Sequence, residues 1–302
     1  MSMETTATAF ATLKATLEDI VTDDTDGYEK GAYYKQYYKV EGMSDNYEDD
    51  LSVGGPGLAT EKSEAQALDV LSLAQGFTTR YTSRKFGLVM QISEELDEDG
   101  KYNDKYCDFA RRMKRAVFKT MEVDGAQILN RATNSAYVFG DGQPLASASH
   151  TIPGGGTFSN TLSTAFSPSR AALIVVRQNL RKMPGWDGVT EGYMPTAVVC
   201  PVVQEGAWEG ILGSEKVPES GNNEINVAKG MKLKLIAVPY WTASATNWLT
   251  LTDAARLKFK VRRKPKARTW YDERTEVINH GISARWGRGC SDPGRAVYFS
   301  NA

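Results

Sequence analysis

The residues best suited to catalysis are His150 and two serines close to it, Ser147 and Ser149. A histidine that removes the proton of a serine hydroxyl turns the serine into a nucleophile, which is the chemistry of many hydrolases. The chain contains no GxSxG turn, the motif that presents the nucleophile in a large class of those enzymes. We therefore predict that the protein is not an enzyme, and a hydrolase centred on His150 is the least favoured alternative.

Cysteine and histidine are too scattered to suggest a metal centre. The three cysteines, Cys107, Cys200 and Cys290, are far apart, and His280 is the only histidine besides His150. No CxxC pair is present, and the odd number of cysteines is typical of a reducing cytoplasm rather than of a disulfide framework. The PGGG run at 153–156 lacks the GxxxxGK[ST] pattern of a phosphate loop. We expect no cofactor.

The charges of the chain are strongly separated along the sequence. Residues 1–99 hold 20 acidic and 8 basic residues, a net charge of −12, whereas residues 100–302 hold 17 acidic and 28 basic residues, a net charge of +11. Such a separation favours attraction between the acidic part of one copy and the basic part of another. The alternative is that both parts are simply solvated.

The densest basic stretch, residues 256–268, holds eight basic residues and no acidic one. Apolar and basic residues alternate in its first half, which predicts a strand with one basic face. Nucleic-acid binding is one interpretation, but the single aromatic residue gives a poor stacking surface. We predict instead a contact between two copies of the chain. Its acidic side is Asp45, Glu48, Asp49 and Asp50, and its basic side is Arg262, Arg263, Lys264 and Lys266.

A long helix at residues 103–133 is the element that must carry these surfaces. Its apolar residues recur at helical spacing, and a helix of this length extends for about 45 Å. Residues 33–40 and 77–92 have the composition of strands, and the long acidic and glycine-rich connection between them predicts a projecting hairpin. Residues 1–32 look like a flexible arm. The predicted buried stripe of the long helix is Tyr106, Phe109, Met113, Val117, Met121 and Ile128.

The second half of the chain alternates helices and short strands. A helix is expected to begin at Ser167 and Pro168, since serine caps a helix and proline suits its first turn. The other predicted elements are strands at 196–200, 232–238, 248–251 and 276–286 and a helix at 202–212. This order predicts an α/β lobe, with the last strand returning to the long helix.

Five segments in a fixed order resemble the major capsid proteins of tailed phages, in particular the group of the Mu-like major head subunit. They are ISEEL (92–96), DGQPLASASHTIPGGGTFSN (141–160), VVCPVVQEGAWEGIL (198–212), NVAKGMKLKLIAVPY (226–240) and NWLTLTD (247–253). The resemblance implies an α+β chain with the Hong Kong 97-type capsid fold. Its parts would be an N-terminal arm (1–32), an extended β-hairpin loop (33–92), a peripheral domain with the spine helix (93–164 and 251–302), and an α/β axial domain (165–250).

The same resemblance implies a structural protein of the virion that assembles in the cytoplasm of a bacterial host. Copies would form hexamers and pentamers of an icosahedral shell around double-stranded DNA. Separate scaffold, portal and decoration proteins are the further expected partners, and no membrane is involved. The alternatives are an encapsulin-like shell that stores protein cargo and a DNA-binding protein that uses residues 256–268.

Overall fold

A computed structural model describes most of the chain. The described residues are 19–20, 30–55, 57–65, 67–68, 70, 75–98, 103–153, 155–164, 166–216, 225–254 and 257–300. The predicted N-terminal arm at 1–32 lies outside the described residues except for 19–20 and 30–32.

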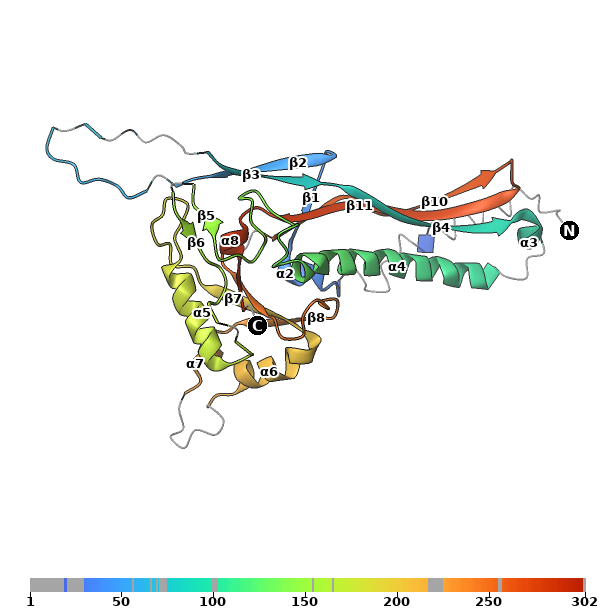
Figure 1. The fold of residues 1–302 in the computed structure, drawn as a ribbon. Helices are drawn as coiled ribbons and strands as arrows, with labels where there is room; N and C mark the ends of the chain where they lie inside the picture. The colour runs from blue at the N-terminus through green and yellow to red at the C-terminus, as the bar shows by residue number, and fades with distance from the viewer. Residues whose placement is uncertain are drawn as a thin grey trace.

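One lobe is a long four-stranded sheet with the helix α4 (Asn103–Asn130) lying along it (Figure 1). The strand order is β1-β10-β11-β4, and β10 and β11 form a long antiparallel pair. Alternation of apolar and basic residues predicted β10, and the helix ends three residues earlier than predicted. The strands are β1 (Lys39–Gly42), β4 (Arg84–Ser93), β10 (Leu257–Asp272) and β11 (Val277–Cys290), and a short helix, α3 (Glu94–Glu98), follows β4.

The buried stripe of α4 follows the predicted spacing at all but one position. Met113, Val117, Met121 and Ile128 are buried, and Tyr106 packs against the same core. Phe109 is 48% exposed, so its assignment to the buried side is wrong. The neighbouring Ala110 is fully buried and occupies that side of the helix instead.

The projecting hairpin is present, but its first strand is not the predicted one. It consists of β2 (Tyr47–Val53) and β3 (Gln75–Thr82), which pair antiparallel, and the described loop residues 57–65 lie beyond both lobes (Figure 1). The predicted strand at 33–40 is instead a helical turn, α2 (Tyr34–Tyr37), followed by β1. The predicted single strand at 77–92 is divided at Ser83, whose N–H donates to the carbonyl of Asn46 (2.9 Å).

Packing explains why the tyrosine-rich segment forms a helical turn. Tyr34, Tyr37 and Tyr38 lie three and four residues apart, and all three are buried against the α4 lobe. The hydroxyl of Tyr38 donates to the carbonyl of Gly125 on α4 (2.9 Å). The carboxylate of Glu122 accepts from the backbone N–H groups that begin α2, which satisfies two groups that a helix leaves unpaired. Tertiary contacts thus override the strand propensity of tyrosine.

The second lobe is a four-stranded sheet in the order β12-β9-β7-β8 with helices packed around it. The helix α5 begins two residues later than predicted, because Ser169 and not Ser167 is its cap: the Ser169 hydroxyl accepts from the N–H of Ala172 (3.1 Å). The elements are α5 (Arg170–Lys182), β7 (Pro195–Pro201), η1 (Val202–Gln204), α6 (Glu205–Gly213), α7 (Val227–Gly230), β8 (Lys234–Val238), β9 (Leu249–Thr252) and β12 (Val297–Phe299).

The end of the chain does not stay in the α4 lobe, to which residues 251–302 were assigned. Strand β12 pairs antiparallel with β9 and so completes the sheet of the second lobe. The short helix α8 (Pro293–Ala296) leads from β11 to β12 and crosses from one lobe to the other. A two-strand ribbon, β5 (His150–Thr151) and β6 (Thr157–Phe158), lies beside this crossing (Figure 1).

No helix within the described ranges is long and apolar enough to cross a membrane. The same part of the chain holds no group of three or more histidine, cysteine, aspartate or glutamate side chains placed to bind a metal ion.

Candidate subunit interface

Three of the four acidic residues predicted to contact another copy are paired within their own chain. The ammonium group of Lys258 lies 2.6 Å from a carboxylate oxygen of Asp50, and that of Lys260 lies 2.7 Å from Glu48. Asp49 receives two hydrogen bonds of 2.7 Å from the guanidinium of Arg80. The two lysine contacts fasten β2 to β10, and the Arg80 contact joins β2 to its hairpin partner β3.

The alternation of side chains along a strand explains this pattern. Glu48 and Asp50 are two residues apart and share one face of β2, and their partners on β10 are also two residues apart. Asp49 points to the other face, where Arg80 is its cross-strand neighbour in the β2–β3 register. Sequence reasoning chose Arg262 to Lys266 and missed Lys258 and Lys260, although a matching two-residue spacing in both segments was the available signal.

Pairing with lysine lowers the pKa of Glu48 and of Asp50. The hydrogen bond from Lys260 is the largest effect on Glu48 and holds its pKa below the ordinary value. Burial raises the pKa of Asp50, but hydrogen bonds from Lys258 and Ser291 outweigh burial, so its pKa is also lowered. A lowered carboxyl pKa means that the contacts in the folded hairpin stabilise the ionised carboxylate relative to the protonated carboxyl group.

The predicted basic residues lie on β10 beyond the hairpin base. Arg262 donates to the side-chain oxygen of Asn46 (3.3 Å), and Arg263 donates to the hydroxyl of Ser283 (2.7 Å). Lys264 and Lys266 are exposed. The fourth acidic residue, Asp45, is exposed and accepts a long hydrogen bond from Ser44 (3.4 Å). The contact of these residues with another copy stays a prediction.

Removal of the two lysines that hold the hairpin tests this arrangement. A double variant, Lys258→Met with Lys260→Met, is expected to loosen β2 and β3 by about 1 kcal/mol per pair, so that amide exchange there accelerates about fivefold for each pair lost. Hydrogen exchange followed by mass spectrometry measures this effect. The control is Lys234→Met, an exposed lysine on β8, which should leave the hairpin unchanged.

The same pairs give an expected pH dependence. Because the folded pKa of both carboxylates is lowered, their stabilisation is complete at neutral pH and falls only as the pH drops below about 4. Hydrogen exchange of the hairpin amides, corrected for the intrinsic pH dependence of exchange, should accelerate below about pH 4 in the wild type but not in the double variant. Equal behaviour of both proteins would contradict the assigned pairs.

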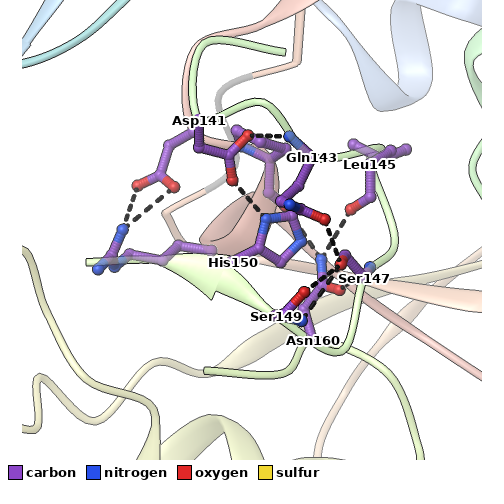
Figure 2. A network of polar contacts seen from close by, with 10 residues as sticks. Asp141, Gln143, Leu145, Ser147, Ser149, His150 and Asn160 are labelled. Carbon is purple, nitrogen blue, oxygen red and sulfur yellow. Dashed lines mark hydrogen bonds and ion pairs between the residues drawn. The ribbon is translucent and has the colours of Figure 1, made fainter. Parts of the chain in front are cut away.

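The arrangement around His150 is structural rather than nucleophilic. Its Nδ1 lies 2.6 Å from a carboxylate oxygen of Asp141, and both side chains are buried (Figure 2). The Ser147 hydroxyl donates a hydrogen bond to the side-chain oxygen of Gln143 (3.0 Å) and accepts one from the backbone N–H of Ser149. Both of these partners are groups other than the imidazole. The structure brings histidine and carboxylate together, but no serine hydroxyl in the described part of the chain hydrogen-bonds to the imidazole.

Asn160 joins this loop to the crossing between the lobes. Its buried amide nitrogen donates to the carbonyls of Leu145 (2.8 Å) and Pro293 (3.2 Å), and its side-chain oxygen accepts from the N–H of Ser147 (2.9 Å) (Figure 2). A buried amide with these partners holds three segments in one position. The network around Asp141 and His150 therefore connects residues 141–160 to α8.

A family model described as phage capsid protein matches residues 76–298, which include the helix α4 and every strand of the two four-stranded sheets except β1 and the last residue of β12. The chain belongs to this family. It is thus a subunit of a phage capsid shell, and the family is structural, which confirms the prediction that the protein is not an enzyme. No curated protein matches the chain.

Solved structures share the fold of this capsid protein at very low sequence identity. A chain from Mycobacterium phage Adephagia is 8% identical, with a TM-score of 0.54 and 89% of each chain covered. The capsid of the cyanophage P-SCSP1u is 11% identical, with a TM-score of 0.54, 86% of this chain and 85% of that chain. A virus-like particle from Pyrococcus furiosus is 9% identical, with a TM-score of 0.52, 94% of this chain and 98% of that chain. The predicted mixed helix-and-strand capsid fold is confirmed; the Mu-like subgroup stays a prediction.

Proposed function

We propose that copies of this capsid protein form hexamers and pentamers of an icosahedral shell around the double-stranded DNA of a tailed phage. The observation that carries the proposal is the capsid family match, which covers 76–298 and therefore most of both lobes. The hairpin formed by β2 and β3 supports it, because an element that projects beyond both lobes has surface to bury only on a neighbour. The α4 lobe would be the peripheral domain and the second lobe the axial domain.

The proposal includes the place and partners of assembly. The shell would assemble in the cytoplasm of a bacterial host with separate scaffold and portal proteins and with decoration proteins on the finished particle. Shells of this kind arise when one surface of a subunit binds a different surface of the next and the geometry closes. The basic residues Arg262, Arg263, Lys264 and Lys266 would form one side of such a contact. Asp45, Glu48, Asp49 and Asp50 of another copy are the sequence-based candidates for the other side.

Particle formation by the purified chain is the test. We expect light scattering and negative-stain electron microscopy to show shells, rings or tubes of capsomer-like units at low salt. Their yield should fall as salt rises, because contacts between exposed charges are screened. The nucleic acid and protein content of the particles is measured alongside. Particles that hold a protein cargo in place of DNA would favour the encapsulin-like alternative, and a monomer that binds DNA and never assembles, even with a scaffold protein, would contradict the proposal.

A further inference from the structure

The face of the large sheet that points away from α4 carries an open groove of about 520 Å³. It runs across β4, β10 and β11, and its walls include Lys85, Arg263 and Arg268 together with the ring of Trp270. Lys85 and Arg268 are exposed, and Arg263 is half-buried. No acidic side chain is among the described residues that line it. The groove is therefore positively charged, as expected for a site that binds an anionic partner.

The strand register places like charges side by side in this face. Arg285 on β11 is the direct partner of Arg263 on β10 and of Lys85 on β4, so three cations form one row across three strands. Like charges at directly opposed positions destabilise a sheet. The Nε atoms of Arg263 and Arg285 are buried and have no hydrogen-bond partner in the described part of the chain. Among the described residues, the hydrogen-bond partners of Arg263 and Arg285 are the neutral side chains of Ser283, Asn46 and Ser83, so no carboxylate there offsets the repulsion of this pair.

Trp270 gives the groove an apolar anchor next to its charges. Its ring lies over Gly281 on β11, where a Cβ atom would come within 3.1 Å of the ring, so glycine at 281 leaves the space that the ring occupies. The side chain is nevertheless 44% exposed. An exposed tryptophan beside arginines is the composition of an energetically dominant contact in protein interfaces.

The same lobe ends in an acidic surface just beyond the groove. Helix α3 lies against the turn between β10 and β11 (Figure 1), and the N–H of Glu94 donates to the carbonyl of Glu276 (3.1 Å). We call this surface the acidic end; it also contains the cation Arg274. Its carboxylates are Glu94, Glu95, Asp272, Glu273 and Glu276, of which Glu95, Glu273 and Glu276 are exposed.

The acidic end cannot fold back onto the groove of its own chain. Asp272 is two residues from Trp270, and β10 and β11 remain paired from the groove to Asp272 and Val277. A second copy has no such restriction. When two lobes overlap end to end in opposite directions, the acidic end of each lies over the groove of the other, so that one two-fold contact satisfies both grooves.

We propose that the groove lined by Lys85, Arg263, Arg268 and Trp270 binds the acidic end of a second copy. This inference rests on the proposed function, in which copies of the chain assemble, and it names the surface that meets Arg263, one of the four predicted basic residues. The acidic end suits the groove better than the hairpin carboxylates, because Glu48, Asp49 and Asp50 already have partners in their own chain.

The test uses two full-length variants with opposite charge changes. The groove variant is Lys85→Glu with Arg268→Glu, and the end variant is Glu95→Lys with Glu273→Lys. Each variant alone should associate at least tenfold more weakly than the wild type in sedimentation velocity at low salt. An equimolar mixture should recover to within about threefold of the wild type, since both contacts in a mixed pair then join opposite charges. Circular dichroism of each variant checks that the fold is kept.

Matched variants separate this contact from other sources of assembly. The control is Lys182→Glu with Lys234→Glu, which reverses the charge of two exposed lysines of the second lobe. Mixing this control with the end variant should not restore association of the end variant. A mixture no better than the separate variants overturns the inference. So does rescue of the groove variant by Asp45→Lys with Asp49→Lys, which would make the hairpin the partner, and so does a groove variant that assembles normally but loses DNA binding.

The outcomes distinguish this inference from the proposed function. If the wild type forms particles and the mixture shows no rescue, the shell stands and the groove contact fails. If the wild type never forms particles but the mixture gives one-to-one dimers, the groove contact stands and the shell fails.

Discussion

Replacing Asp124 by alanine is expected to destabilise the protein by about 3–5 kcal/mol, the cost of removing one partner from a buried charge network. The carboxylate of Asp124 receives Arg84 (2.8 and 3.0 Å), Arg288 (3.1 Å) and the indole N–H of Trp286 (2.9 Å). Asp124 and Arg288 have side chains only 11% and 13% exposed. The variant would leave a guanidinium and an indole N–H buried without their acceptor.

The carboxylate of Asp124 connects the helix and the sheet of the α4 lobe through polar contacts, and we call this set of contacts the junction. Asp124 lies on α4, Arg84 on β4, and Trp286 and Arg288 on β11, so a single side chain joins the helix to two strands. The ring of Trp286 is itself fully buried and stacks on Phe86 at 4.2 Å. Loss of the junction should therefore loosen the whole sheet and not only the helix.

Denaturant unfolding measures the effect of Asp124→Ala. The matched control is Asp108→Ala, which removes an exposed carboxylate of the same helix that pairs with Arg111 at 2.8 Å and should change stability by about 0–1 kcal/mol. Asp124→Asn should fall between the two, because the amide oxygen still accepts hydrogen bonds but carries no charge. An Asp124→Ala variant as stable as the Asp108→Ala control would show that the network contributes nothing.

Local patterns in the sequence were sufficient for the elements whose packing follows a simple period. The apolar spacing of α4 and the alternation in β10 each report burial on one side, and both elements formed as predicted. Prediction failed where contacts with distant residues decide the structure. Residues 34–38 form a helical turn because Glu122 and Gly125, almost ninety positions away, supply the hydrogen bonds.

The candidate interface shows the same division. The sequence showed which segments are acidic and which are basic, and the predicted basic strand lies within β10. The pairing of Glu48 with Lys260 and of Asp50 with Lys258 depends on how β2 approaches β10, which no local pattern encodes. The groove was also beyond sequence reasoning, because it needs the register that aligns Lys85, Arg285 and Arg263 across three strands.

Replacing His150 by alanine is expected to cost about 3–5 kcal/mol, for a reason unrelated to catalysis. His150 and Asp141 are 1% and 4% exposed and lie 2.6 Å apart, so the variant buries a carboxylate without its partner and opens a cavity against Phe158. Asp141→Ala should be comparably damaging. Thermal or denaturant unfolding of the full-length chain gives both values.

The double variant Asp141→Leu with His150→Phe decides between a structural and a chemical role for this pair. Apolar residues of similar size leave no buried side-chain group of the pair unpaired and remove only the acceptor of the partly buried Gln143 N–H (3.1 Å). The double variant should therefore be more stable than either alanine variant, even though it has lost both polar side chains. Particle formation should recover with stability. A double variant that is folded and stable yet fails to assemble would instead show that the imidazole and carboxylate act in assembly itself, beyond holding residues 141–160 against α8.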